Sequence, residues 1–357
     1  MKKNKRIKNF LKQGKNIYFG KGTNSKYLTE FESSNLIVFW LNSKWVILTD
    51  MRYFEALKNK KLKATILNIS SQKDKLIFKT EFLNSKTNQI YFDASITTVE
   101  ELERLKLIFK RIDSGIEFIA LHDFDQIRLI KSNDEIKNTK FAISETDKIF
   151  SNIINFIKVG MTEKDIEKEI RRQILFSPAS KESFSPIVAA GINSSNPHWE
   201  ATDYVIKKGD LIVLDFGQFY KNSCSDMTRT IIIGKDISDK QKEVYQIVKE
   251  AQIEAIKAAK PGITASELDS VAREYIEKRG YGEYFIHSLG HGIGYEIHES
   301  PNISKNQNLI LESGMIITIE PGIYLPNEFG IRIEDDILIT NDGNINLTNS
   351  KKEIIFI

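Results

Sequence analysis

The stretch HSLGHGIGYEIHE, residues 287–299, holds three of the five histidines in this chain of 357 residues. Glycines flank His291 on both sides, so the backbone there can turn tightly and approach a ligand closely. A lone histidine is usually a satisfied core residue, whereas three in one glycine-rich segment favour a binding site more strongly. Spacing alone leaves both interpretations open.

Carboxylates interrupt apolar, strand-like runs in the same half of the chain. Each of four acidic residues lies at the edge of such a run or within it: Asp215, Asp226, Glu320 and Glu334. Burying an unpaired carboxylate costs several kcal/mol, so these residues must be paired or must bind a metal. Arg229 and Arg332 could pair with one or two of them, which leaves the others for cations of another kind.

Two divalent cations would balance the charge of four carboxylates. Ligands that are mostly oxygen suit Mn²⁺, Fe²⁺ or Co²⁺ better than a structural zinc, which favours Cys and His. Asp215 and Asp226 are eleven residues apart across Gly217, which predicts a hairpin with the two aspartates on facing strands. Arg332 and Glu334 would share a face if their segment is one strand, and Arg332 could then hold a ligand carboxylate.

Five segments resemble, in order, the ligand motifs of the pita-bread metallopeptidases. They are LDFG (214–217), SDMTRT (225–230), GHGIG (290–294), IEPG (319–322) and RIED (332–335). The resemblance runs from about residue 130 to the end of the sequence and is strongest to prolidase and Xaa-Pro aminopeptidase. The region before it resembles the creatinase-type N-terminal domain more loosely, chiefly at NSKYLT (24–29) and LTDMRY (48–53).

The resemblance implies a role for each site residue. The metal ligands of the family are two Asp, one His and two Glu, which fall here on Asp215, Asp226, His291, Glu320 and Glu334. Glu320 would also act as the catalytic base, with His298 and His198 as further catalytic residues. Contacts to the substrate would come from His198, His287, His298, Tyr324 and Arg332. The expected cofactor is a pair of divalent ions, Mn²⁺ first, with Co²⁺, Fe²⁺ and Zn²⁺ as alternatives.

The sequence predicts an α+β protein of two domains. Residues 1–125 are expected to form a small creatinase-like α/β domain, and residues 126–357 a pita-bread catalytic domain. Capping boxes at Ser132, Ser238 and Thr264 predict three helix starts. A hairpin is predicted over 36–48, and later strands over 211–215, 226–233, 315–320 and 331–339. Helices and hairpins come in separate runs, which is typical of α+β folds.

The leading interpretation of function is an Xaa-Pro aminopeptidase, which cuts the bond in front of a proline at the second position of a peptide. Prolidase, which acts on Xaa-Pro dipeptides, is the alternative, because the same metal ligands serve both enzymes. Methionine aminopeptidase shares the ligands but usually lacks an N-terminal domain of this size. A non-catalytic binding protein on this fold would typically have lost ligands, and all five are present here.

Composition limits the partners. The net charge is +3, with both signs interspersed, which argues against a nucleic-acid or membrane partner. No run approaches the ~18 apolar residues of a membrane span. Cys224 is the one cysteine, so no internal disulfide can form, and a cytoplasmic location is expected. We expect Cys224 to be a small buried side chain rather than a reactive thiol. The resemblance further implies a homodimer.

Overall fold

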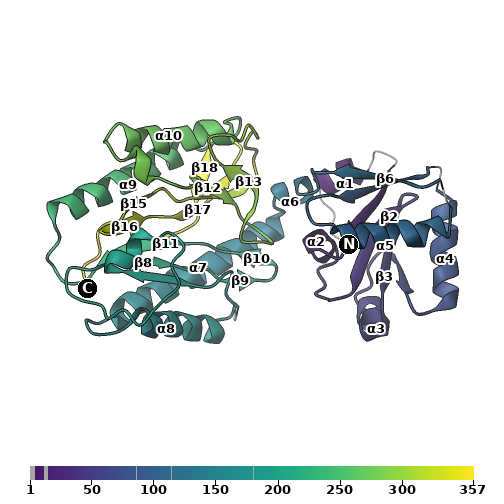
Figure 1. Ribbon diagram of the computed structural model, residues 1–357, viewed down its shortest axis with the longest axis horizontal. Coiled ribbons are helices and arrows are strands. Elements are labelled where there is room, and N and C mark those ends of the chain that lie inside the picture. The colour runs from purple at the N-terminus through teal and green to yellow at the C-terminus, as the bar shows by residue number, and fades with distance from the viewer. Residues whose placement is uncertain (1–4, 12–14, 86, 114, 180) are drawn as a thin grey trace. The chain divides into compact units, whose positions relative to one another are not determined.

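The chain folds into two compact units, Met1–Ile127 and Arg128–Ile357. The computed structural model describes residues 5–11, 15–85, 87–113, 115–179 and 181–357 (Figure 1). None of the helices described there is both long enough and apolar enough to cross a membrane.

The N-terminal unit is built on one six-stranded mixed sheet with the strand order β4-β3-β2-β1-β5-β6. Its strands are β1 (Asn16–Gly20), β2 (Leu36–Leu41), β3 (Lys44–Thr49), β4 (Thr65–Asn68), β5 (Gln89–Asp93) and β6 (Glu117–Leu121). Its helices are α1 (Lys5–Leu11), α2 (Thr23–Thr29), α3 (Met51–Asn59), α4 (Gln72–Leu83) and α5 (Val99–Lys110), and α6 (Gln126–Leu129) follows at the junction. The predicted α/β architecture of this domain is confirmed.

The predicted hairpin is present in that sheet. Strands β2 and β3 pair antiparallel from Leu36 opposite Thr49 to Leu41 opposite Lys44. The two linking residues, Asn42 and Ser43, have φ values of 46° and 61°, as expected for the two-residue turn that matches the twist of antiparallel strands.

Among its described residues, the C-terminal unit contains four sheets, two of which are two-stranded hairpins, and two pairs of long helices. Its helices are α7 (Asn133–Phe156), α8 (Glu163–Phe176), α9 (Asp239–Ala258) and α10 (Ala265–Glu277), with 3₁₀ turns η1 (Gly191–Ser195) and η2 (Gly282–Tyr284). One sheet has the order β11-β8-β7, from β7 (Ile187–Ala190), β8 (Leu211–Asp215) and β11 (Thr228–Ile232). Another has the order β13-β12-β14-β17-β18, from β12 (Gly290–Gly292), β13 (Glu299–Ile303), β14 (Ile316–Ile319), β17 (Asp335–Ile339) and β18 (Asn344–Asn346). Two separate hairpins complete the unit. One is formed by β9 (Phe219–Tyr220) with β10 (Ser223–Cys224), and the other by β15 (Gly322–Leu325) with β16 (Phe329–Arg332).

The strands of this unit lie between the two helix pairs. One apolar core joins α9 and α10 to β14, β15, β16 and β17, and a second joins α7 and α8 to β7, β8 and β11. In Figure 1 the strands accordingly run between α9–α10 on one side and α7–α8 on the other. Both helix pairs bury their apolar faces against the strands, so the strand ends are free to carry polar groups. The expected pita-bread architecture is confirmed.

The sequence predicted the three helix starts correctly but was wrong about one strand. Capping boxes are present at Ser132, Ser238 and Thr264, where each predicted helix begins. The single strand predicted over 331–339 is wrong, because β16 ends at Arg332 and β17 begins at Asp335 in a different sheet. Glu334 therefore lies in the crossing between two sheets and does not share a strand face with Arg332.

Candidate active site

The antiparallel pair β8–β11 presents the two aspartates. Asp215 ends β8 opposite Thr228, the first residue of β11, and Asp226 precedes that strand by two residues. Gly217 lets the connecting hairpin close tightly, because a Cβ there would lie 1.8 Å from the carbonyl oxygen of Ser225. The predicted hairpin thus brings both carboxylates to one end of the sheet.

The next sheet presents the histidine and a glutamate. His291 is the middle residue of β12, and Glu320 follows β14 directly. The His291 Nε2 lies 3.6 Å from Asp226 Oδ2 and 3.4 Å from Glu320 Oε1. Its Nδ1 lies 3.0 Å from the carbonyl oxygen of Gly292, which can only accept. The Nδ1–H therefore donates to that carbonyl, and the Nε2 lone pair faces the carboxylates.

The residues present fit a metal centre. One ligand atom from each of Asp226, His291 and Glu334 lies within 4.8 Å of the others. Asp215, Asp226 and Glu334 each have a buried carboxylate oxygen that receives no hydrogen bond from any described residue. Buried polar atoms are normally satisfied, so three unsatisfied oxygens around one imidazole are the arrangement that divalent cations would complete.

Charge repulsion in this cluster shifts the pKa values of its members. Burial raises the pKa of Glu320 to about 8. Arg332 acts to lower this pKa, and the Asp215 carboxylate acts to raise it. Burial, and then the neighbouring carboxylates, raise the pKa values of Asp226 and Glu334 well above their usual range. Without cations the cluster cannot hold all of its carboxylates charged at neutral pH, which again favours a metal-binding site.

Arg332 orders one side of the cluster. Its Nη2 donates to Asp215 Oδ2 at 2.6 Å, its Nε to Thr228 Oγ1 at 3.1 Å and its Nη1 to the Tyr324 hydroxyl at 2.8 Å. The Tyr324 hydroxyl lies 3.0 Å from His287 Nε2. Because His287 Nδ1 contacts a carbonyl oxygen at 2.7 Å, Nε2 is the acceptor for Tyr324. Burial, and then Arg332, lower the pKa of His287 to about 3, so this imidazole is neutral.

The other two histidines predicted for the site, His198 and His298, are exposed. The His298 ring packs edge-on against the His291 ring, with centroids 4.4 Å apart. Burial is the first cause that lowers the pKa values of His287 and His298, and His198 contributes to both. All of the predicted site histidines therefore gather around the carboxylate cluster, although no direct contact of His198 with it is described.

Three polar residues of the site were not predicted. The Thr228 hydroxyl donates to Glu334 Oε2 at 2.6 Å, and the Thr318 hydroxyl accepts from the His291 backbone N–H at 3.0 Å. Asp336 Oδ2 accepts the backbone N–H of Asp226 at 3.0 Å. Thr228 and Thr318 each lie two residues from a predicted ligand, so the period of a strand could have identified them.

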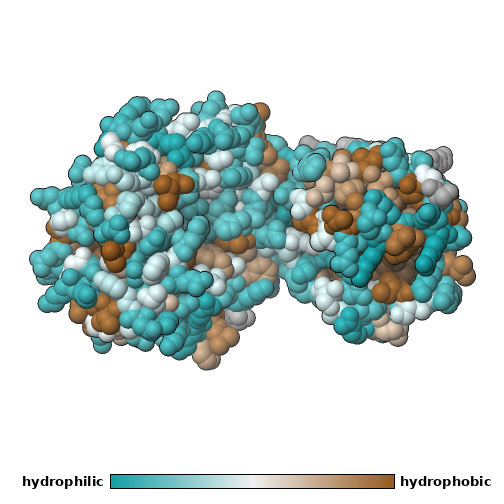
Figure 2. All heavy atoms as spheres, viewed as in Figure 1, coloured by the Kyte–Doolittle hydropathy of each residue, from teal (hydrophilic) through white to brown (hydrophobic). Residues whose placement is uncertain are grey.

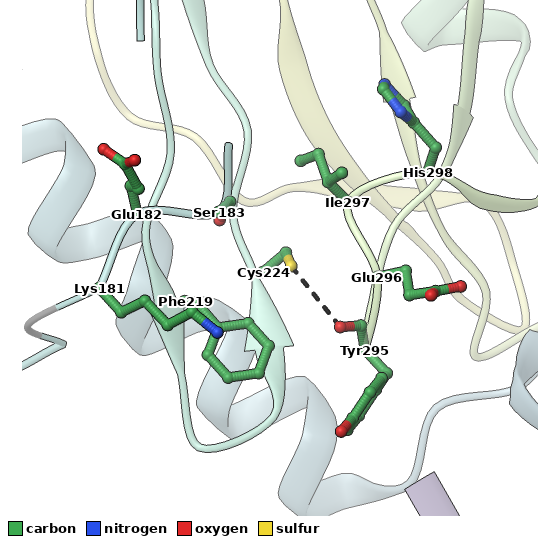
Figure 3. Close-up of a pocket in the computed structure, with 9 residues that line it drawn as sticks. All are labelled: Lys181, Glu182, Ser183, Phe219, Cys224, Tyr295, Glu296, Ile297 and His298. Carbon is green, nitrogen blue, oxygen red and sulfur yellow. Dashed lines mark hydrogen bonds between the residues drawn. The ribbon is translucent and has the colours of Figure 1, made fainter. Parts of the chain in front are cut away.

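Two cavities adjoin the site. One of about 390 Å³ is bordered by His298 and Ile297 on one wall and by Lys181, Glu182 and Phe219 on the facing wall (Figure 3). The other, of about 570 Å³, is bordered by Tyr324 and by residues of η1 and η2. Cys224 lines the first cavity but is buried, and burial raises its thiol pKa to about 12. The prediction of a buried cysteine is confirmed.

Comparison with known proteins gives matches over nearly the whole chain. Residues 137–341 match the metallopeptidase family M24, and residues 12–130 match the creatinase/prolidase N-terminal domain. The chain is 45% identical to an Xaa-Pro dipeptidase of Pyrococcus horikoshii over 72% of this chain and 71% of that protein. Among solved structures, it is similar to an Xaa-Pro dipeptidase from Bacillus anthracis (TM-score 0.91, 36% identity, 99% and 98% of the two chains). It is also similar to an X-Pro aminopeptidase from Thermotoga maritima (TM-score 0.85, 35% identity, 96% and 97%).

Proposed function

We propose that this chain, which belongs to the metallopeptidase family M24, is a two-metal Xaa-Pro dipeptidase. That it is a proline-specific metallopeptidase follows from its family and its relatives. The choice of dipeptides differs from the leading interpretation of the sequence, which was an aminopeptidase. It is supported by the relatives that are named for a proline-specific activity, most of which are Xaa-Pro dipeptidases or prolidases.

The observation that carries the proposal is the set of unsatisfied carboxylate oxygens around His291. Asp215, Asp226, His291, Glu320 and Glu334 would together hold two divalent ions, for which we propose Mn²⁺. Such a pair, when bound, supplies Lewis-acid polarisation and lowers the pKa of a water towards neutrality. The chain's part is to hold these side chains with their free oxygens facing one another.

Peptide hydrolysis also needs a group that moves a proton to the leaving nitrogen. That nitrogen belongs to proline, carries no hydrogen in the substrate and must gain one before it departs. Glu320 suits this step, because its carboxyl lies within the cluster, with Oε1 3.4 Å from His291 Nε2. The exposed His298 would donate a hydrogen bond to the scissile carbonyl, and His198 and the neutral His287 would contact the substrate.

The same residues suggest how substrates are chosen. An imide offers no N–H for recognition, so specificity for proline must come from the ring and the carbonyl. A carboxylate-rich site favours a free amino terminus nearby. We further propose that the protein is cytoplasmic, because its one cysteine, Cys224, is free and buried. The family resemblance also leads us to propose a homodimer.

Xaa-Pro aminopeptidase is the second candidate. The similarity to the Thermotoga maritima enzyme supports it. The cavity of about 570 Å³ beside Tyr324 supports it as well, since that space could take residues beyond the proline.

A hydrolysis panel with Mn²⁺ tests both candidates. We expect turnover of Ala-Pro, little turnover of Ala-Pro-Ala, and none of Ala-Ala-Ala or N-acetyl-Ala-Pro. Efficient cleavage of Ala-Pro-Ala would support the aminopeptidase instead. Comparable turnover of Ala-Ala-Ala would contradict proline specificity, and turnover of the acetylated dipeptide would contradict the need for a free amino terminus.

A further inference from the structure

A buried ionic cluster lies directly behind His298. The next residue, Glu299, begins β13, and its side chain is 2% exposed. Lys131 Nζ lies 2.7 Å from Glu299 Oε1, and Arg128 Nε lies 3.2 Å from Oε2. Both cationic side chains are as deeply buried, at 3% and 4% exposure. Each oxygen of this carboxylate therefore has its own cation.

The loop that carries His298 is held at several other points. Its residues 293–298 join β12, which carries His291, to β13. The carbonyl of Gly294 accepts the backbone N–H of Cys224 at 2.7 Å, and the N–H of Ile293 donates to Ile316 at 3.1 Å. Near its end the loop forms the cavity wall with Ile297 and His298, which Figure 3 shows turned away from Cys224.

Within the part of the chain that the structure describes, no hydrogen bond of the His298 imidazole is found, and the ring rests on His291. Its position therefore depends on its backbone, which continues directly into the anchored Glu299. Gly294 packs closely against the Glu299–Lys131 pair, since a Cβ there would lie 2.5 Å from Glu299 Oε1 and 2.8 Å from Lys131 Cε.

The two cations come from the start of the catalytic unit. Arg128 is its first residue, and Lys131 is fixed there by its backbone N–H, which donates to Gly314 at 2.8 Å. A buried carboxylate that loses a cation must either leave the interior or take up a proton. If the carboxylate leaves the interior, the end of the loop moves, and His298 moves with it.

We propose that Glu299 is a positioning residue for His298, and that Arg128 and Lys131 hold it in place. The proposal rests on the proposed function, in which His298 contacts the scissile carbonyl. It makes the segment that begins the catalytic unit part of the support of the active site.

The test is a double-mutant cycle in the full-length, Mn²⁺-loaded enzyme with an Xaa-Pro substrate. Lys131→Met and Glu299→Gln should each lower kcat by roughly 10–100-fold, the usual cost of losing a partner that orients a site residue, with little change in KM. In a His298→Ala background the same changes should have almost no further effect on kcat. Lys131→Arg should restore most of the rate. Lys148→Met, which removes an exposed lysine paired with Glu145, is the matched control and should leave kcat unchanged.

A second measurement does not need activity. In the metal-free protein, hydrogen exchange of the backbone amides of residues 293–298 should be faster in Lys131→Met and Glu299→Gln than in the wild type or Lys148→Met. Equal losses of kcat with and without His298, or unchanged exchange in the loop, would overturn the proposal. If the wild type cleaves no Xaa-Pro substrate, the proposed function fails, and the exchange experiment still decides whether Glu299 holds the loop.

Discussion

Glu334 and Asp335 are adjacent buried acids with opposite surroundings. Asp335 receives Arg229 Nη2 at 2.7 Å on one oxygen, and Asn346 at 2.6 Å and Lys352 on the other. Burial raises the pKa of Asp335, but Arg229 and Lys352 outweigh it, so the pKa is lowered. Glu334 has one oxygen with no partner among the described residues, and burial and neighbouring acids raise its pKa.

The difference separates a structural carboxylate from one that we propose as a metal ligand. Around Asp335 the fold supplies cations and a donor until both oxygens are satisfied. Where the acid must bind a metal, the fold leaves an oxygen free and accepts a less stable metal-free protein. Burial alone does not distinguish the two residues, whereas the satisfaction of each oxygen does.

Substitution of a metal ligand should have the largest effect on activity. Asp226→Asn and His291→Ala are expected to reduce turnover of Ala-Pro to background, because each removes a ligand of the proposed pair of ions. Metal content by elemental analysis should fall from about two ions per chain. Full activity with one tightly bound ion would contradict the two-metal proposal.

The same Asp226→Asn protein sharpens the comparison. Without metal it should be more stable than the metal-free wild type, since an amide is neutral without taking up a proton, whereas the buried Asp226 carboxyl must take one up. Denaturant unfolding in EDTA measures this difference, and a lower midpoint than that of the wild type would count against the interpretation.

Asp335→Asn should lower the stability of the protein, whereas Asp226→Asn should raise that of the metal-free form. It leaves Arg229 and Lys352 without their carboxylate, and Arg229 is 1% exposed, so we expect a loss of roughly 3–5 kcal/mol in the free energy of unfolding. Arg229→Met is the matched variant from the other side of the pair. A loss smaller than that of an ordinary surface substitution in both variants would show that this network is not structural.

Sequence reasoning located the site by the same logic, but it could not separate these neighbours. Apolar runs interrupted by acids indicated Asp215, Asp226, Glu320 and Glu334, and the structure brings all four together with His291. The local sequence around Asp335 has the same character as that around Glu334. Only the long-range pairing of Arg229 and Lys352 with Asp335, across about a hundred residues in the case of Arg229, tells them apart.

The fold followed the same division between local and long-range signals. Helix starts were predictable because a capping box is complete within four residues. The break between β16 and β17 was not predictable, because no Gly or Pro marks a turn between Ile331 and Ile339 and the change of sheet depends on distant partners. The partners of Glu299 escaped prediction for the same reason, since Arg128 and Lys131 lie far from it in sequence.

The smallest effect expected is a pH dependence of the metal-free protein. The pKa of Glu320 is raised from 4.5 to about 8, first by burial. Between these values the folded state keeps a proton that the unfolded state has lost, so stability must fall as pH rises through the window. Burial lowers the pKa of His287 from 6.5 to about 3, which makes stability fall as pH drops below 6.5. The interval from pH 6.5 to 8 therefore separates the carboxyls of the cluster, Glu320 among them, from His287.

In that interval the metal-free wild type should lose on the order of 1–2 kcal/mol of stability, seen as a falling Tm. The Mn²⁺-loaded protein should not show this loss, because its carboxylates are already ionised and bound to cations. Glu320→Gln is the control, and its metal-free form should have the flatter profile. A metal-free Tm that stays constant or rises from pH 6.5 to 8 would mean that Glu320 is not kept protonated by its surroundings, and the repulsion inferred for the cluster would be wrong.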